Sequence, residues 1–243
     1  MVLDSSQIQV FQIISGVLVF LSILLVIFST FGITRFFERR EAGKIPFYYA
    51  FSNLSFLISA TCINMGLLDA IEVGTKTHIY YWGLIGMNIG IILASMFLYQ
   101  FFSELNDIPK EKRIICVIFA FLIICFQLLP QNNWFVEFSQ GFQLKYISYL
   151  LQTIYCVSIY LSSAIGLKLL ASHVEEQRTS FICIMTGNIL LCIFFLLMMM
   201  RAFIKDGPML LVIQLSSWIL QIIALILLFW GFIRPSIKKG DVK

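Results

Sequence analysis

The sequence predicts an all-α, polytopic membrane protein, a seven-transmembrane-helix bundle that forms one domain over residues 1–243. Composition is the first observation behind this prediction. Apolar residues make up 60% of the chain and charged residues 12%, whereas soluble domains average about 45–50% and about 25%. The second observation is spacing, because all 30 Asp, Glu, Lys and Arg residues lie outside seven long charge-free windows. Together these observations exclude an ordinary soluble enzyme and a disordered chain.

Each charge-free window is long enough for one helix to cross a bilayer. The shortest has 22 residues, and a helix needs about 20 apolar residues to cross a hydrocarbon core about 30 Å thick. Backbone groups in lipid must be hydrogen-bonded within their own segment, which favours helices. Runs such as 114–129 are apolar on both faces, unlike the alternating strands of a barrel. The predicted spans cover, approximately, residues 9–33, 46–68, 79–102, 114–130, 146–168, 180–200 and 209–233.

The ends of the spans carry further signals. Asp4 precedes the first span and no basic residue does, so we expect a retained helix rather than a cleaved signal peptide. Pro46 opens the second span, and Pro130 and Pro208 stand at span ends, where proline does not interrupt a helix. The fourth span has Gln127 as its single polar residue, which predicts a peripheral place in the bundle.

The basic residues predict the orientation of the chain. Thirteen of the 17 Lys and Arg follow the first, third, fifth or seventh span, and the other four are Lys76, Lys145, Arg201 and Lys205. Cytoplasmic loops carry the excess of Lys and Arg, so we expect the N-terminus outside and the C-terminus in the cytoplasm, in the cell membrane. The net charge of +4 follows from these loops and does not indicate nucleic acid, because the basic residues are split among short loops.

Polar side chains form stripes along several spans. On the second and third spans, rows of small residues such as Gly86, Gly90 and Ala94 predict close helix packing. Larger polar side chains on the third, fifth and seventh spans are candidate walls of a ligand pocket without formal charge: Asn88, Gln152, Tyr155, Gln214 and Gln221. The competing interpretation is that these groups hydrogen-bond between helices.

The predicted spans contain no ionisable residue at depth. Such residues mark ion paths, proton relays and retinal counter-ions, and the seventh span has no lysine that could bind retinal. His78 and His173 are predicted on opposite sides of the bilayer and cannot share a metal ion. The six cysteines lie within spans, where they pack as small apolar residues. We therefore expect no catalytic residues, no metal, no cofactor and no enzyme activity.

These absences favour a receptor-like or sensor-type bundle that acts through a separate cytoplasmic protein. The predicted cytoplasmic loops offer basic residues for docking such a partner, namely Arg35, Arg39, Arg40, Lys110, Lys112 and Arg113. Two alternatives stay open. One is an uncoupled transporter or permease for a small neutral solute, and the other is a structural subunit of a membrane complex.

Overall fold

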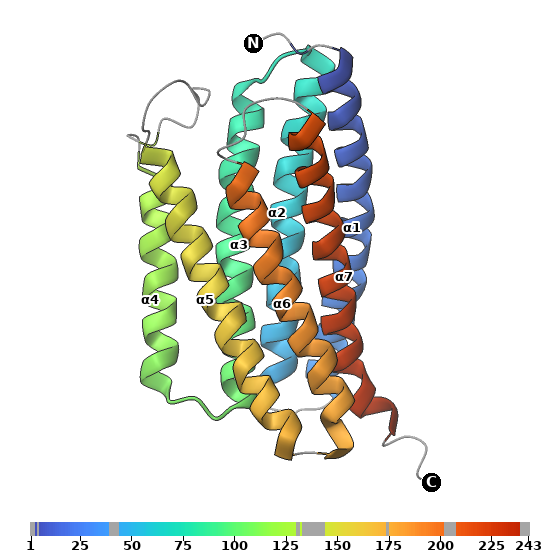
Figure 1. Ribbon diagram of the computed structural model, residues 1–243, viewed down its shortest axis with the longest axis vertical. Coiled ribbons are helices and arrows are strands. Elements are labelled where there is room, and N and C mark those ends of the chain that lie inside the picture. Colours follow the sequence, from blue (N-terminus) through green and yellow to red (C-terminus); the bar gives the residue numbers. More distant parts are fainter. Residues whose placement is uncertain are drawn as a thin grey trace. The chain divides into compact units, whose positions relative to one another are not determined.

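The chain is all-helical over the part that the structure, a computed structural model, describes: residues 3, 5–38, 44–129, 132, 144–173, 175–201 and 208–238 (Figure 1). These residues contain one 3₁₀ turn, η3 (Glu175–Gln177), and seven α-helices, which are α1 (Ser5–Glu38), α2 (Ile45–Val73), α3 (His78–Leu105), α4 (Lys110–Gln127), α5 (Leu144–His173), α6 (Arg178–Arg201) and α7 (Pro208–Lys238). The predicted all-α class is confirmed.

Six of the described helices are long and apolar enough to cross a membrane, which indicates an integral membrane protein. They extend past the charge-free windows, as α1 does from Ser5 to Glu38. A window marks only the stretch without charged residues, whereas a helix that crosses a bilayer can continue into the headgroup layer, where charged side chains are solvated.

Helix α4 is the exception among the seven. It has 18 residues, and its first four are all charged. The remaining apolar stretch, 114–127, measures about 21 Å at about 1.5 Å per residue, which is less than the hydrocarbon core of about 30 Å. The helix also ends at Gln127, before the predicted end of the fourth span at residue 130. A count of seven spans therefore depends on α4 being a short crossing helix.

The chain divides into two compact units, Met1–Gln152 and Thr153–Lys243, with the division inside α5. In the N-terminal unit α1 and α2 run antiparallel. Ser15 Oγ donates to Asn64 Oδ1 at 2.7 Å. Near the other end of this helix pair, a Cβ atom added at Gly32 would lie 2.9 Å from Ala50 Cβ. Helix α1 also touches α3, because Phe11 stacks on Tyr80 with ring centroids 5.9 Å apart.

Small residues bring α2 and α3 into close contact. A Cβ added at Gly90 would lie 2.8 Å from Ser59 Cβ and 2.9 Å from Ser55 O, and one added at Gly83 would lie 2.6 Å from Cys62 O. Two serine hydroxyls of α2 donate across this contact, Ser52 to Ala94 O at 2.9 Å and Ser59 to Met87 O at 3.0 Å. The predicted packing role of the small-residue rows is confirmed.

In the C-terminal unit α6 and α7 form a second close antiparallel pair. A Cβ added at Gly187 would lie 2.9 Å from Ala224 O, and one at Gly231 would lie 2.7 Å from Ser180 O. On α7, Ser217, Ala224 and Gly231 face α6 and are spaced by seven residues, as in a coiled-coil interface. Two contacts lie further along the pair: Ser217 Oγ is 3.6 Å from Met198 Sδ, and the Phe194 and Trp218 ring centroids are 5.8 Å apart.

The α2–α3 contact gives the first prediction. Gly90→Leu places a side chain where backbone atoms approach, and overpacking of this kind destabilises by about 1–3 kcal/mol. We expect a fall in the melting temperature of the protein in detergent. Gly16→Leu is the matched control, because a Cβ at Gly16 meets no atom within 4 Å. Leu161→Ile, at a residue 51% exposed on α5, is a second control. Equal melting temperatures for Gly90→Leu and Gly16→Leu would contradict the assigned contact.

Candidate functional site

A cluster of four buried polar side chains joins the end of α4 to the start of α5 in the N-terminal unit. Gln127 Nε2 donates to Gln152 Oε1 at 3.1 Å and to Ser148 O at 3.3 Å. Ser148 Oγ donates to Asn132 Oδ1 at 2.5 Å. All four side chains are buried, and Gln127 and Ser148 are fully so. We call Gln127, Asn132, Ser148 and Gln152 the α4–α5 cluster.

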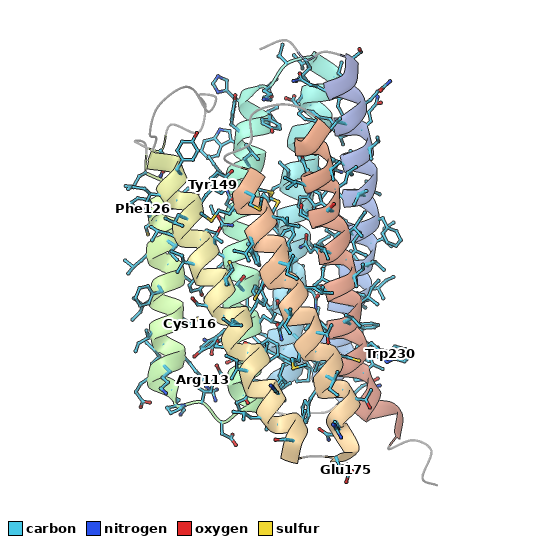
Figure 2. All side chains as sticks on the ribbon, viewed as in Figure 1. Arg113, Cys116, Phe126, Tyr149, Glu175 and Trp230 are labelled. Carbon is cyan, nitrogen blue, oxygen red and sulfur yellow. The ribbon has the colours of Figure 1, made fainter. Side chains whose placement is uncertain are left out.

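Asn132 completes this cluster from outside the helices. Its Nδ2 donates to Phe126 O and to Gln127 O at the C-terminal end of α4, and its backbone N–H donates to Leu129 O at 3.0 Å. The side chain thus satisfies carbonyls that have no partner within the last turn of a helix. The sequence prediction missed Asn132, although a proline and polar residues directly after an apolar helix are a signal for such an end. In Figure 2 Phe126 and Tyr149 mark this end of α4 and α5.

The Gln152 amide, which was predicted to line a pocket, therefore forms a hydrogen bond between α5 and α4. Its carbonyl accepts from Gln127 on α4. A hydrogen bond between two amides is stronger in a low-dielectric interior, and loss of Gln152 leaves the Gln127 amide with Ser148 O as its remaining acceptor. The bond supports the interhelical interpretation for Gln152, and its role toward a ligand stays a prediction.

The other four predicted pocket residues are not members of this cluster. Asn88 belongs to α3 in the N-terminal unit, is 1% exposed, and neither of its amide atoms has a hydrogen-bond partner among the described residues. Tyr155 is half-buried on α5, in the C-terminal unit. Gln214 and Gln221 are buried on α7. They fall in the same row as Ser217 and Ala224, which faces α6.

Arg113 forms hydrogen bonds that stabilise the turn between α3 and α4 (Figure 2). Its guanidinium donates to Ile108 O at 2.8 Å, to Ser103 O at 3.0 Å and to Glu104 Oε1 at 2.5 Å. Gln100 Nε2 on α3 donates back to Arg113 O at 3.3 Å. Arg113 was predicted as a docking residue, but the structure uses its planar donors within the chain, and its side chain is only 16% exposed.

The other residues of the predicted docking set differ in their surroundings. Lys110 and Lys112 are exposed at the start of α4. Arg35 lies with its guanidinium carbon 5.0 Å from the centroid of the Phe31 ring. Arg39 and Arg40 lie outside the described residues. Lys110 and Lys112 are thus the members of the predicted docking set that the structure places at an exposed surface.

The buried polar side chains between the helices are neutral amides, hydroxyls and an indole. No Asp, Glu, Lys, Arg or His is buried among the residues whose burial the structure describes, and no group of three or more described His, Cys, Asp or Glu could hold a metal ion. The cysteines are free thiols, and two of them, Cys156 and Cys192, are buried. Amides, hydroxyls and an indole N–H can orient an uncharged molecule by hydrogen bonds, but they cannot neutralise an ionic one.

Comparison with protein-family models, with curated proteins and with solved structures found no match.

The α4–α5 cluster gives a second prediction. Gln152→Leu removes one of the two acceptors of the buried Gln127 amide and leaves Ser148 O as the other, and an unsatisfied buried group costs about 1–3 kcal/mol. We expect the melting temperature in detergent to fall. The double variant Gln127→Leu/Gln152→Leu replaces both partners by apolar groups, a change that is nearly neutral, so it should recover much of the loss. A double variant less stable than Gln152→Leu would contradict the pairing.

The turn between α3 and α4 gives a third prediction. Arg113→Lys keeps the charge but loses the planar donors that reach two carbonyls and a carboxylate at once. We expect faster hydrogen exchange of backbone amides in 103–113 than in the native protein, measured by mass spectrometry. Lys112→Arg, a change on an exposed neighbour, is the control. Unchanged exchange in Arg113→Lys would show that the turn does not depend on the guanidinium.

Proposed function

We propose that the chain is a receptor-like or sensor-type protein of the cell membrane, with seven spans, that acts through a separate cytoplasmic protein. In this proposal the N-terminus lies outside, the C-terminus lies in the cytoplasm, and α4 is the short fourth span. The excess of basic residues after alternate helices supports this orientation. The protein is proposed to have no enzyme activity of its own.

The observation that carries the proposal is the continuity of α5. This helix runs without interruption for 30 residues, or about 45 Å at about 1.5 Å per residue. One end carries Ser148 and Gln152 of the α4–α5 cluster. The other end carries the exposed Lys168 and leads into the turn with the exposed Glu175 (Figure 2). A change of hydrogen bonding at the cluster can therefore shift a helix whose far end reaches the predicted cytoplasmic side.

The absence of buried charge argues against a transporter that is coupled to an ion gradient. A transporter coupled to protons or sodium needs ionisable groups within the membrane, and no Asp, Glu, Lys, Arg or His is buried among the residues whose burial the structure describes. The unpartnered amide of Asn88 favours one second candidate, an uncoupled permease for a small neutral solute. A permease would need no cytoplasmic partner, so the two candidates differ in whether the exposed lysines of α4 matter.

The docking proposal is tested by cross-linking in intact cells followed by mass spectrometry. We expect a cytoplasmic protein to be recovered with the native chain and lost from Lys110→Glu/Lys112→Glu, because the change reverses the charge of the docking surface. Lys76→Glu, on the predicted outer side, is the matched control and should retain the partner. Recovery that is the same for all three proteins would remove the docking proposal.

Orientation is tested with thiol labelling. A cysteine introduced at Ser5 should react with an impermeant thiol reagent added outside intact cells, and one at Ser236 should react only after the cells are opened. The native protein, whose cysteines lie within helices, gives the background. The opposite labelling would reverse the orientation, and outside labelling at both positions would give an even number of spans.

A further inference from the structure

The core of the C-terminal unit holds four buried polar atoms without a hydrogen-bond partner among the described residues. They are Ser163 Oγ, Asn188 Oδ1, Trp218 Nε1 and Gln221 Oε1. None of the four residues is more than 4% exposed. They come from α5, α6 and α7, which are the three helices of this unit.

Two of these residues lie on facing sides of α5 and α6. On α6, Asn188 shares a face with Cys192 and Phe195, which are four and seven residues further on. That face contacts α5, because Cys192 Sγ lies 3.8 Å from Val157 O and the rings of Phe195 and Tyr160 stack with centroids 5.5 Å apart. On α5, Ser163 follows Tyr160 by three residues and so lies on the side that faces α6.

The other two residues lie on the side of α7 that faces α6. Gln221 falls between Ser217 and Ala224, which contact Met198 and Gly187 of α6. Trp218 contacts Phe194 through its ring. The sequence predicted Gln221 as a pocket wall, whereas Asn188 is the single amide of its span and was not predicted.

Ser163, Asn188 and Gln221 lie at similar depths, and Trp218, level with Phe194, lies about 9 Å further along α6 than Asn188. Helices α6 and α7 are antiparallel, and Gly187 meets Ala224 while Phe194 lies against Trp218. Gln221 is therefore within one turn of the level of Asn188, or about 5 Å. Helix α5 joins α6 through the short turn at η3 and also runs antiparallel to it. Ser163, three residues past the Tyr160–Phe195 contact, reaches about the same level.

The orphaned atoms form a complementary set. Trp218 Nε1 is a donor, the two amide oxygens are acceptors, and the serine hydroxyl can do either. The orientation of the Asn188 amide is fixed, because its Nδ2 donates to Ile184 O at 3.1 Å. A buried polar group without a partner costs about 1–3 kcal/mol, and unsatisfied groups in native proteins are few. Four in one core need a common explanation.

We propose that Ser163, Asn188, Trp218 and Gln221 form a buried binding site for an uncharged molecule that offers at least two donors and one acceptor. Internal water and a small neutral solute such as a polyol or an amide share this chemistry. The occupant is uncharged, because no Asp, Glu, Lys, Arg or His is buried among the residues whose burial the structure describes, so none is placed to neutralise a charge. This site lies within α5–α7 alone and does not depend on whether the protein is a receptor or a permease.

The site is tested by NMR on the perdeuterated protein in perdeuterated detergent, observing the tryptophan indole N–H groups. The chain has four tryptophans, and the resonance missing from Trp218→Phe assigns the one of interest. We expect a cross-peak from the Trp218 indole proton to a bound molecule. A partner at the water frequency identifies internal water, and carbon-bound protons identify a co-purified solute. Absence of both cross-peaks overturns the proposal.

A pair of adjacent serines provides the second measurement. Ser163→Ala removes a group of the site, whereas Ser162→Ala removes an exposed hydroxyl that donates to Ile159 O at 2.9 Å. We expect Ser163→Ala to lower the melting temperature more than Ser162→Ala, because a bound occupant loses a hydrogen bond. If the hydroxyl has no occupant, its removal relieves an unsatisfied group and stabilises the protein. A melting temperature for Ser163→Ala equal to or above that of Ser162→Ala therefore overturns the proposal.

Discussion

The exclusion of water from the bilayer core is the constraint on which the rest of this structure depends. A backbone or side-chain polar group in that layer finds its partner inside the protein or remains unsatisfied. The constraint explains why the described chain is helical, since a helix satisfies its own backbone. It also explains why serine hydroxyls on α2 reach backbone carbonyls of α3, at Ala94 and Met87.

The same constraint decides how the helices associate. Lipid tails are as apolar as leucine, so burial of apolar surface gives little gain between helices in a membrane. Close backbone approach replaces it, at Gly83 and Gly90 in the N-terminal unit and at Gly187 and Gly231 in the C-terminal unit. Amide pairs such as Gln127 with Gln152 add directional contacts at one end. Polar groups that this arrangement leaves without a partner, as in the core of α5–α7, are those that we propose to bind a neutral molecule.

Much of the architecture could be predicted from the sequence, because charge is excluded from lipid and small residues mark close contacts. The windows located the helices, and the glycine row of α3 predicted a close helix contact without identifying α2 as the partner. Helix ends were less predictable, since α1 and α7 continue past the charge-free stretch and α4 ends earlier than expected. A charge-free window shows where a charged side chain would be costly. The end of a helix depends instead on the hydrogen bonds that its last residues make with nearby groups.

The candidate site was less predictable for a related reason. Asn132 and Arg113 act from the ends of helices, and their partners are backbone carbonyls that carry no mark in the sequence. Asn188 is a single amide among apolar neighbours, and its meaning depends on Ser163 and Gln221, which are distant along the chain. Helical periodicity groups residues on one helix, but it cannot tell which helices face one another.

The central claim is that the apolar outer faces of these helices, including the short α4, lie in lipid. Spin labels at Ile118 and Leu122 of α4 and at Leu161 of α5, all at least 51% exposed, test it most directly in reconstituted bilayers. Collision rates with oxygen, which concentrates in the hydrocarbon, are compared with those of a water-soluble nickel chelate. The account predicts that oxygen dominates at all three positions. Dominance of the nickel chelate at Ile118 and Leu122 would place α4 in water and contradict the account.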